Sequence, residues 1–408
     1  THYLGNVQPR LGRGFIATNA TAKPWQINFI CLLFHAKIFE NEKLSENIQS
    51  QSQCEFNLQS PETNMISTKI FFPVVLGLFL AGAAFAGDTR TAKYANEFLS
   101  LGGGGRALGM GGAYAALATD VTAGYWNPAG LVNIEYPQIM LMHTEQFDRT
   151  VKYDYGSFAI PFGANRSLGI GLIRLGVDDI PVTRLQNPAL PLGAVYVDDG
   201  GITRINRPYI FRTISDAEYA LFLSYGVKRS ERFSFGVNAK VLRKSVGDNS
   251  AWGLGFDVAA LCRPVGDLRL GLNFQDITTT VLAWNQGTRE IIVPTLKAGL
   301  AYPVAIPMLN GYMSPALDFD IRFEGRDYAA QLAAGPVSVD THLGWEYQFQ
   351  EVFSLRLGSD TGRFAAGAGI NLPKIQIDYA FIGHEDLGET HRVSARFTIE
   401  AAKYRRAK

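Results

Sequence analysis

Apolar and polar residues alternate along most of the chain from Ile139 onward. In the clearest segment, residues 317–324, four large apolar side chains alternate with four charged ones. A period of two is typical of β-strands, because successive side chains point to opposite faces of a sheet. We expect the apolar face of this segment to leave water and the charged face to meet it.

Fourteen segments show this pattern, and most are eight to twelve residues long: 139–147, 152–161, 167–177, 218–228, 233–244, 252–263, 268–276, 295–302, 315–323, 341–349, 353–360, 363–372, 375–381 and 390–399. Strands that cross a bilayer in a tilted barrel need about 9–11 residues and come in even numbers in bacterial outer-membrane proteins. A soluble β-sandwich would alternate too, but strands of globular proteins average about 5–6 residues. The sequence therefore predicts an all-β fold, a transmembrane antiparallel β-barrel of about fourteen strands within residues 137–408.

The lengths of the connections agree with this fold. Outer-membrane barrels have short turns on the periplasmic side and long loops outside. With the first strand rising from the periplasm, the three longest connections, residues 178–217, 277–294 and 324–340, are expected outside. Two connections do not fit: residues 303–314 are long for the periplasmic side, and the turn at residues 361–362 is short for the outside.

An apolar run, Ile70–Ala86, follows Lys69 near the start of the chain. A basic residue, a short apolar run and a small-x-small ending predict a signal peptide over residues 65–86, cleaved before Gly87. The alternative is a membrane anchor, but these 17 residues are fewer than the about 20 that a spanning helix needs. Residues 1–64 are then interpreted as upstream sequence translated in error, with Met65 as the true start; the alternative is a cytoplasmic N-terminal domain.

The alternation fails between the predicted signal peptide and the first strand. Residues 87–136 are rich in clustered glycines, which permit close backbone approach or positive φ angles. Residues 114–118 are expected to form a short helix. Because the lumen of a barrel of about fourteen strands is too wide for wall side chains to fill, we expect residues 87–136 to fold inside it as an N-terminal hatch or plug.

Composition excludes several classes of function. The chain has 38 basic and 37 acidic residues, so no net charge favours binding to nucleic acid. The three cysteines have no metal-like spacing, the glycine run lacks the Lys-Ser/Thr of a phosphate loop, and no GxSxG motif occurs. His342 near Asp340, and His384, have the side chains for metal binding or acid–base work, but solvated rim positions are the better interpretation. We expect no enzyme activity, no cofactor and no metal.

The most unusual local composition is a run of five residues in which two aromatic residues precede a turn-forming Asn-Pro pair: Tyr125, Trp126, Asn127, Pro128 and Ala129. This run either gates the lumen or contacts a ligand, or it only anchors the chain where it enters the first strand. Both interpretations stay open from the residues alone.

At these residues the chain resembles a known family. The stretch from Phe98 to Asp120, continued by NPAGL at residues 127–131, is similar to the N-terminal signature of the PorV/PorQ family of outer-membrane proteins. Later blocks at residues 268–277, 296–303 and 378–394 resemble the same family, so the resemblance spans about residues 95–399. NPAGL alone is shared with the wider FadL-like group, whose members are fourteen-stranded barrels with an N-terminal hatch.

The resemblance implies an outer-membrane location in a Gram-negative-type bacterium and two alternative functions. PorV-like proteins bind secreted cargo and partner with secretion-machinery subunits in type IX secretion and surface attachment, whereas FadL-like proteins carry long-chain fatty acids or other hydrophobic molecules inward. For the first, the external connection 178–217 offers residues favoured at interfaces: Arg204, Arg207, Tyr209, Phe211 and Arg212. For the second, the lumen needs an apolar pocket with a lateral or axial opening. In both, outer-membrane lipid surrounds the barrel.

Overall fold

The computed structural model describes residues 89–91, 97–147, 149–324, 326, 330–383 and 388–407. All of them belong to one compact unit, residues 68–408. The segment 1–64 and the signal peptide 65–86 lie outside the described residues, so both stay predictions.

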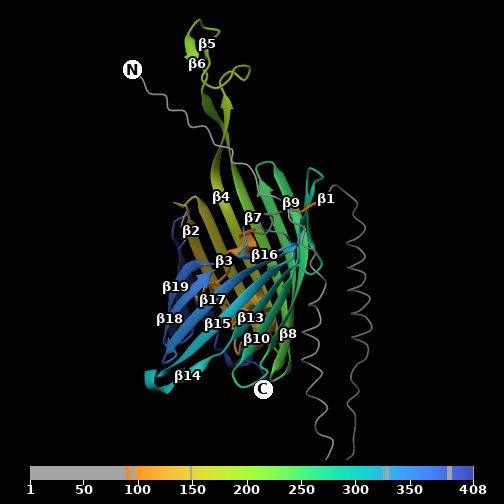
Figure 1. Ribbon diagram of the computed structural model, residues 1–408, viewed down its shortest axis with the longest axis vertical. Coiled ribbons are helices and arrows are strands. Elements are labelled where there is room, and N and C mark those ends of the chain that lie inside the picture. The colour runs from red at the N-terminus through yellow and green to blue at the C-terminus, as the bar shows by residue number, and fades with distance from the viewer. Residues whose placement is uncertain are drawn as a thin grey trace, which may run out of the picture. The chain divides into compact units, whose positions relative to one another are not determined.

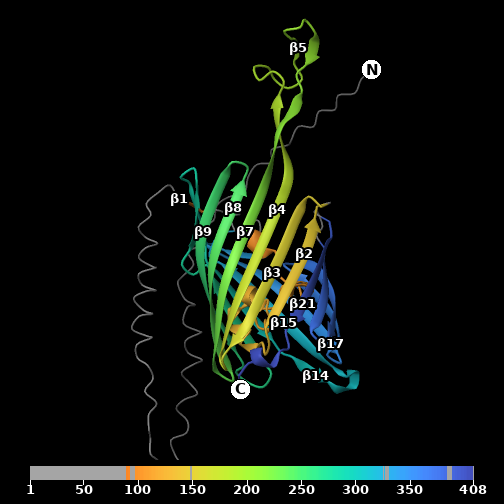
Figure 2. The ribbon, with the colours of Figure 1, turned by 180° about the vertical axis from the view of Figure 1, so that it is seen from behind.

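Fourteen antiparallel strands form a closed ring, in which each strand pairs with the next and the last pairs with the first. The ring strands are β2 (Gln138–Gln146), β3 (Val151–Phe162), β4 (Arg166–Leu185), β7 (Pro208–Ser230), β8 (Phe233–Val246), β9 (Asn249–Cys262), β10 (Arg269–Gln275), β13 (Thr295–Ala301), β15 (Gly311–Arg322), β17 (Val337–Phe349), β18 (Phe353–Asp360), β19 (Arg363–Leu372), β20 (Ile375–Ile382) and β21 (Thr390–Thr398). Figures 1 and 2 show the ring from opposite sides. The predicted all-β barrel of fourteen strands is confirmed.

The alternation in the sequence separates the two faces of the wall. On β4, the outward Leu168, Ile170 and Leu172 are 45%, 44% and 48% exposed, while the inward Ser167 and Ile173 are buried. Large outward aromatic side chains lie near the strand ends, among them Phe162, Phe233, Trp252, Phe353 and Phe364. An apolar outer band with aromatic residues at its borders is the surface that lipid requires. Among the described residues, no helix is long and apolar enough to cross a membrane.

One end of the ring carries mostly short turns and the end of the last strand β21, and the other carries a tall hairpin. We call these the periplasmic end and the external end, because short turns face the periplasm in outer-membrane barrels. The two-residue turn at the external end, Thr361 and Gly362, has φ values of 52° and 91°. Positive φ at both central residues suits a tight hairpin, so this unexpectedly short external turn does exist.

The connection 178–217 is not a loop, and that prediction was wrong. β4 continues to Leu185 and β7 begins at Pro208, and the two strands pair along almost this whole length. A second small hairpin, β5 (Val195–Val197) with β6 (Thr203–Ile205), completes what we call the extension, residues 178–215. Figure 1 shows it rising above the ring. The polar and Pro-containing sequence marks the end of membrane contact, but strand pairing continues beyond it.

The other irregular connections also contain strands. Residues 277–294, expected as a loop, hold β11 (Thr280–Trp284) and β12 (Arg289–Ile292), and residues 324–340 hold β16 (Leu332–Ala334) and the start of β17. The periplasmic residues 303–314 form a hairpin of β14 (Val304–Ile306) with β15, closed by the short 3₁₀ helix η2 (Pro307–Leu309). The alternation of apolar and polar residues identifies which residues face outward, but it does not show how far each pair of strands extends.

Residues 97–134, the inner segment, supply most of the buried apolar core together with inward side chains of the wall. The segment contains α2 (Glu97–Ser100), α3 (Gly105–Gly109), α4 (Ala123–Trp126) and the 3₁₀ helix η1 (Pro128–Asn133). The short helix expected at residues 114–118 is absent: these residues form a turn in which Leu117 and Ala118 both donate to the Tyr114 carbonyl, at 2.9 Å each. Two wall strands hold this turn, because Asp318 accepts from the Tyr114 and Ala115 nitrogens and a Cβ at Gly271 would be 2.2 Å from the Ala115 oxygen.

Candidate functional site

The inner segment contacts the wall at backbone distance because both sides supply glycines. Gly111 has φ +63°, and the inward wall residue Gly358 lies so close that a Cβ there would be 2.4 Å from the Gly111 nitrogen. A side chain at position 358 would therefore collide with backbone atoms that have no freedom to move aside. The glycine clusters of the sequence thus serve close approach between the inner segment and the barrel.

A wall carboxylate holds the turn that follows. Asp318 of β15 is 2% exposed, and its Oδ2 accepts backbone hydrogen bonds from Tyr114 (2.9 Å) and Ala115 (2.7 Å). Asp320, two residues along the strand, is 5% exposed. The expectation that the charged face of residues 317–324 meets water was therefore wrong at these two positions. The alternation correctly identifies the inward face, but it carries no information on what fills the lumen.

Deeper in the lumen, two arginines share one glutamate. Arg106 of the inner segment donates to both oxygens of Glu346, at 2.9 and 2.6 Å, and Arg356 of β18 donates to the same carboxylate at 2.7 Å. Arg356 also pairs with Asp378 at 2.8 Å. Because breaking such a buried network leaves an unpaired charge, it fixes the inner segment to wall residues of the strands β17, β18 and β20.

The five-residue motif singled out in the sequence lies at the centre of the inner segment. Asn127 is fully buried; its side-chain amide donates to the carbonyls of Ala115 (2.8 Å) and Ala260 (3.2 Å), and its Oδ1 accepts from the Ala129 nitrogen (3.1 Å). Pro128 then begins the 3₁₀ helix η1. The motif thus joins two parts of the inner segment to strand β9.

The two aromatic residues of the motif pack edge to face, with ring centroids 4.9 Å apart. The Trp126 indole donates to the Gly103 carbonyl at 2.7 Å, and the Tyr125 hydroxyl donates to the Leu99 carbonyl. Tyr125 also packs against Phe222 of the wall, with ring centroids 6.0 Å apart. These contacts hold both aromatic side chains within the inner segment, and Trp126 also lines the cavity described next. Anchoring, gating and ligand contact all stay predictions for this motif.

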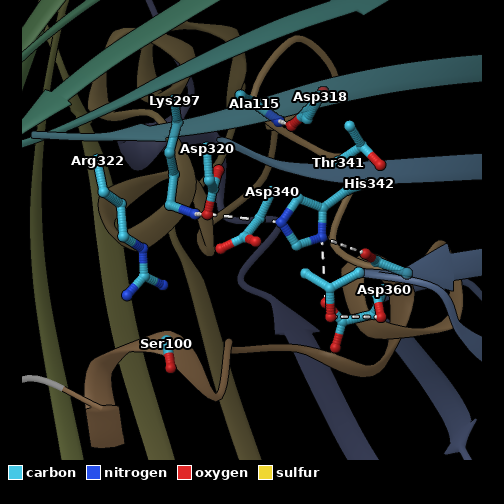
Figure 3. A network of polar contacts seen from close by, with 12 residues as sticks. Ser100, Ala115, Lys297, Asp318, Asp320, Arg322, Asp340, Thr341, His342 and Asp360 are labelled. Carbon is cyan, nitrogen blue, oxygen red and sulfur yellow. Dashed lines mark hydrogen bonds and ion pairs between the residues drawn. The ribbon is translucent and has the colours of Figure 1, made fainter. Parts of the chain in front are cut away.

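Above the inner segment, towards the external end, lies a cavity of about 790 Å³, the upper cavity. His342 is at the centre of its polar side (Figure 3). Its Nδ1 donates to the Gly111 carbonyl at 2.8 Å and lies 3.2 Å from Asp360, and its Nε2 lies 3.5 Å from Asp320, which also pairs with Lys297. The expectation of a solvated rim position for His342 was wrong, because its inward side chain meets the inner segment. His384 lies outside the described residues.

The lining of the upper cavity has two kinds of surface. The apolar side is contributed by the inner segment and by strands β4 and β20: Phe98, Leu101, Leu108, Trp126, Leu175 and Ile382. The polar side includes Arg322, whose guanidinium lies 3.8 Å from the Glu97 carboxylate, and the buried Arg392, which donates to the Leu101 carbonyl. Such a lining suits a solute with an apolar body and a polar or anionic end.

Beside the upper cavity, the wall strand β15 ends at a lower level than β12, the external continuation of β13. The last residues that join β13 to β15 are Thr295 and Arg322, and Arg322 also lines the cavity. Above them, β12 pairs with β11 and, in parallel, with the three-residue strand β1 (Thr89–Thr91), while β16 pairs with β17. Because Ser338 of β17 pairs with Arg322 on one side and with Ala333 of β16 on the other, β16 lies on the β18 side of β17. Among the described residues, β1 is the one strand that pairs with the β15-facing side of β12, and we call this stretch of wall above Arg322, between β12 and the end of β15, the wall break.

A buried charge cluster lies where the wall strand bends towards this break. Between β10 and β11, Asp276 and Thr279 have positive φ values of 54° and 59°. Lys240 of β8, 2% exposed, pairs with Asp257 at 2.7 Å and with Asp276 at 2.8 Å. Asn238 connects this cluster to the inner segment by donating to Asp257 (3.0 Å) and to the Gly124 carbonyl (2.9 Å). The bend and the inner segment are thus held by one network.

The predicted partner-binding residues are spread along the extension. Arg204 on β6 pairs with Asp198, and this hydrogen bond holds the pKa of the Asp198 carboxyl below its ordinary value. Arg212 on β7 pairs with Asp248 at 2.7 Å, and the Arg184 guanidinium lies 3.5 Å from the Phe211 ring centroid. The remaining two residues, Arg207 and Tyr209, are exposed on the same extension. The structure does not gather the five into one cluster, and partner binding there stays a prediction.

Sequence reasoning missed the charged residues of these buried networks, namely Lys240, Asp276, Asp318 and Arg356, and it placed His342 at the rim. The one signal was a charged residue at an inward strand position, and that signal does not distinguish a water-filled lumen from a packed one. Among the described residues, no group of His, Cys, Asp and Glu side chains has the geometry of a metal site.

A closed, even-numbered antiparallel ring with an apolar outer band defines the class: the protein is a transmembrane β-barrel of the outer membrane of Gram-negative bacteria. No family model matches the chain, and no curated protein matches it. Among solved structures it is similar to the Ralstonia pickettii toluene transporter TbuX, with 13% identity, a TM-score of 0.48, and coverage of 73% of this chain and 99% of that one.

It is also similar to a Pseudomonas aeruginosa FadL homologue, with 11% identity, a TM-score of 0.45, and coverage of 72% of this chain and 98% of that one. For the Pseudomonas putida toluene transporter TodX the identity is 12%, the TM-score 0.43, and the coverage 72% and 96%. The class stated above rests on the strand pairing and the outer surface of this chain. Membership in the PorV/PorQ family stays a prediction.

Proposed function

We propose that the protein is a non-enzymatic outer-membrane channel that carries a small hydrophobic or amphipathic solute from outside, with the inner segment acting as a hatch. The observation that carries this proposal is the wall break beside the upper cavity. A solute that enters from the external end reaches a cavity with an apolar and a charged side, and beside that cavity β15 ends at Arg322 while β12 extends further.

A sideways exit is favoured over an axial one by how the lumen is filled. Towards the periplasmic end, η1 packs against the wall so closely that a Cβ at Gly236 would be 2.4 Å from the Ala129 nitrogen. Asn127 and Ser234 add hydrogen bonds to the same region. An axial path would have to break these contacts, whereas a hydrophobic solute that leaves through the wall break enters lipid, which dissolves it without a further barrier from water.

Uptake of radiolabelled laurate and of toluene by cells that carry the protein tests this proposal. Leu175→Trp fills part of the upper cavity from β4, and we expect it to lower uptake several-fold. Leu172→Trp is the matched control, because this residue of the same strand faces lipid and is 48% exposed. Absence of uptake above the empty-vector level for both probes, with the wild-type barrel correctly inserted, would overturn the transport proposal.

A second candidate, binding and shuttling of secreted cargo in a type IX-like system, is favoured by the extension. Its exposed apolar side chains include Val195 (66%), Val197 (65%) and Ile210 (63%), which an ordinary solvated hairpin does not need. Affinity purification from native outer membranes, with the wild type and with residues 186–207 replaced by a short turn, tests this candidate. Secreted proteins that share a C-terminal domain and are lost with the replacement would support it, and their absence from both samples would count against it.

A further inference from the structure

One periplasmic connection differs in chemistry from the others. Residues 303–314, between β13 and the body of β15, contain no Asp, Glu, Lys or Arg. The connections at residues 231–232, 263–268, 350–352 and 373–374 each contain a charged residue, and the one at 163–165 is followed directly by Arg166. A periplasmic turn of this length that meets only water would be expected to carry polar or charged side chains, as its neighbours do.

The tip of this hairpin is apolar and open. Met308 is 94% exposed and Leu309 is 53% exposed. The outward side of the strand continues the lipid-facing wall without interruption, through Leu300 (41%), Tyr302 (49%) and Val304 (37%). The hairpin is therefore an extension of an apolar surface that already contacts lipid.

The direction of the hairpin agrees with this continuity. Figures 1 and 2 show β14 and its turn projecting sideways from the periplasmic rim, beyond the outline of the ring. Strands of membrane barrels are tilted by about 35–45°, so a hairpin that outgrows its neighbours leans along the membrane surface. Its tip is thus directed towards the border of the periplasmic leaflet.

We propose that residues 303–313 form a lateral foot that lies on the periplasmic leaflet of the outer membrane, with Met308 and Leu309 at the boundary between headgroups and acyl chains. Lipid is the occupant because the apolar face is continuous with the wall and contains no charge that would pair with a protein. Pro303 and Pro307 also make the free edge of this hairpin a poor template for an added strand, since proline cannot donate to a β-ladder. Amphipathic surfaces of this kind bind interfaces through buried apolar area.

Fluorescence in phospholipid nanodiscs tests the foot. Met308→Cys is labelled with an environment-sensitive dye in a background in which Cys31, Cys54 and Cys262 are replaced by serine. Glu351→Cys is the matched control, because it lies in the neighbouring β17–β18 turn at the same end of the barrel. Heat-modified migration on gels confirms that each labelled barrel is folded.

We expect lipid carrying a shallow doxyl group to quench the dye at position 308 several-fold more than the dye at position 351, and dissolved iodide to show the opposite order. Equal iodide quenching at both positions would place the hairpin in water and overturn the foot. A dye at position 308 that is shielded in native outer membranes but not in nanodiscs would also overturn it, because a protein would then cover the hairpin.

Discussion

The periplasmic and external parts of the barrel interior are built from the same kind of strand but are filled differently. Towards the periplasm, the inner segment meets the wall at backbone distance, through glycines and hydrogen bonds. Towards the outside, the lumen keeps a cavity of about 790 Å³, and beside it β15 ends at Arg322 while β12 extends further. The same fold thus combines a packed region with an open one.

This difference in packing indicates which part of the lumen has to move in a conformational change. In the packed region the inner segment and the wall share buried hydrogen bonds, such as Asn127 to the Ala260 carbonyl and Ser234 to the Ala129 carbonyl, so movement there breaks several contacts at once. The open region depends on few restraints, and one of these is the Lys240 cluster at the bend between β10 and β11. We therefore expect substitutions to rank by how many of these shared contacts they break.

The largest effect is expected where the two regions meet. Lys240→Met leaves Asp257 and Asp276 buried without their cation, and losing one partner of a buried ion pair costs about 3–5 kcal/mol. Denaturant unfolding of the barrel in lipid measures this loss. The matched control is Lys244→Met, on the same strand, because its pair with Glu218 at 2.7 Å is more exposed, with 11% and 12% of the two side chains accessible.

A Lys240→Met barrel as stable as the Lys244→Met barrel would show that the bend does not depend on the cluster. Asn238 would then not couple the packed region to the open region. A selective loss at Lys240 would instead support a bend that is held from inside the lumen.

A smaller loss is expected where the inner segment packs against β18 at the edge of the upper cavity. Gly358→Ala places a Cβ 2.4 Å from the Gly111 nitrogen, and overpacking of this kind costs about 1–3 kcal/mol. Gly171→Ala is the control, because it also faces inward but has its nearest neighbour atom at 3.7 Å. Limited proteolysis of the inner segment and denaturant unfolding both report the change. Equal behaviour of the two variants would mean that the inner segment is not seated against the wall as described.

The sequence predicts the strands of the barrel wall more completely than it predicts the packing inside the lumen. Alternation identified all fourteen strands, because a lipid-facing side and a lumen-facing side impose a strict period of two. It misjudged the surroundings of Asp318 and Asp320, since an inward carboxylate has the same pattern whether it meets water or the backbone of Tyr114. The wall break has no clear pattern in the sequence either, because Asp276 and Pro294 have the composition of ordinary loop residues when their strand partners are unknown.

The candidate site was predictable in part. The run from Tyr125 to Ala129 was conspicuous by its composition, and the structure places it in the centre of the inner segment. His342 and Arg392 were not predictable as cavity residues, since their position depends on contacts between strands far apart in the chain. Such long-range contacts appear only when the ring closes.

The smallest effect is expected outside both regions, on the extension. The carboxylate of Asp198 accepts the Gly200 and Ile202 amides at 3.0 and 2.9 Å and pairs with Arg204. Because the pKa of Asp198 is lowered in the folded state, this contribution is present above the pKa of the unfolded chain and is lost as pH falls through the folded value. Asp198→Ala should therefore reduce hydrogen-exchange protection of these two amides, as acid does in the wild type, while unfolding of the barrel stays unchanged. A shift in barrel unfolding would show that the extension is coupled to the wall, and would remove the separation between the extension and the membrane-embedded ring.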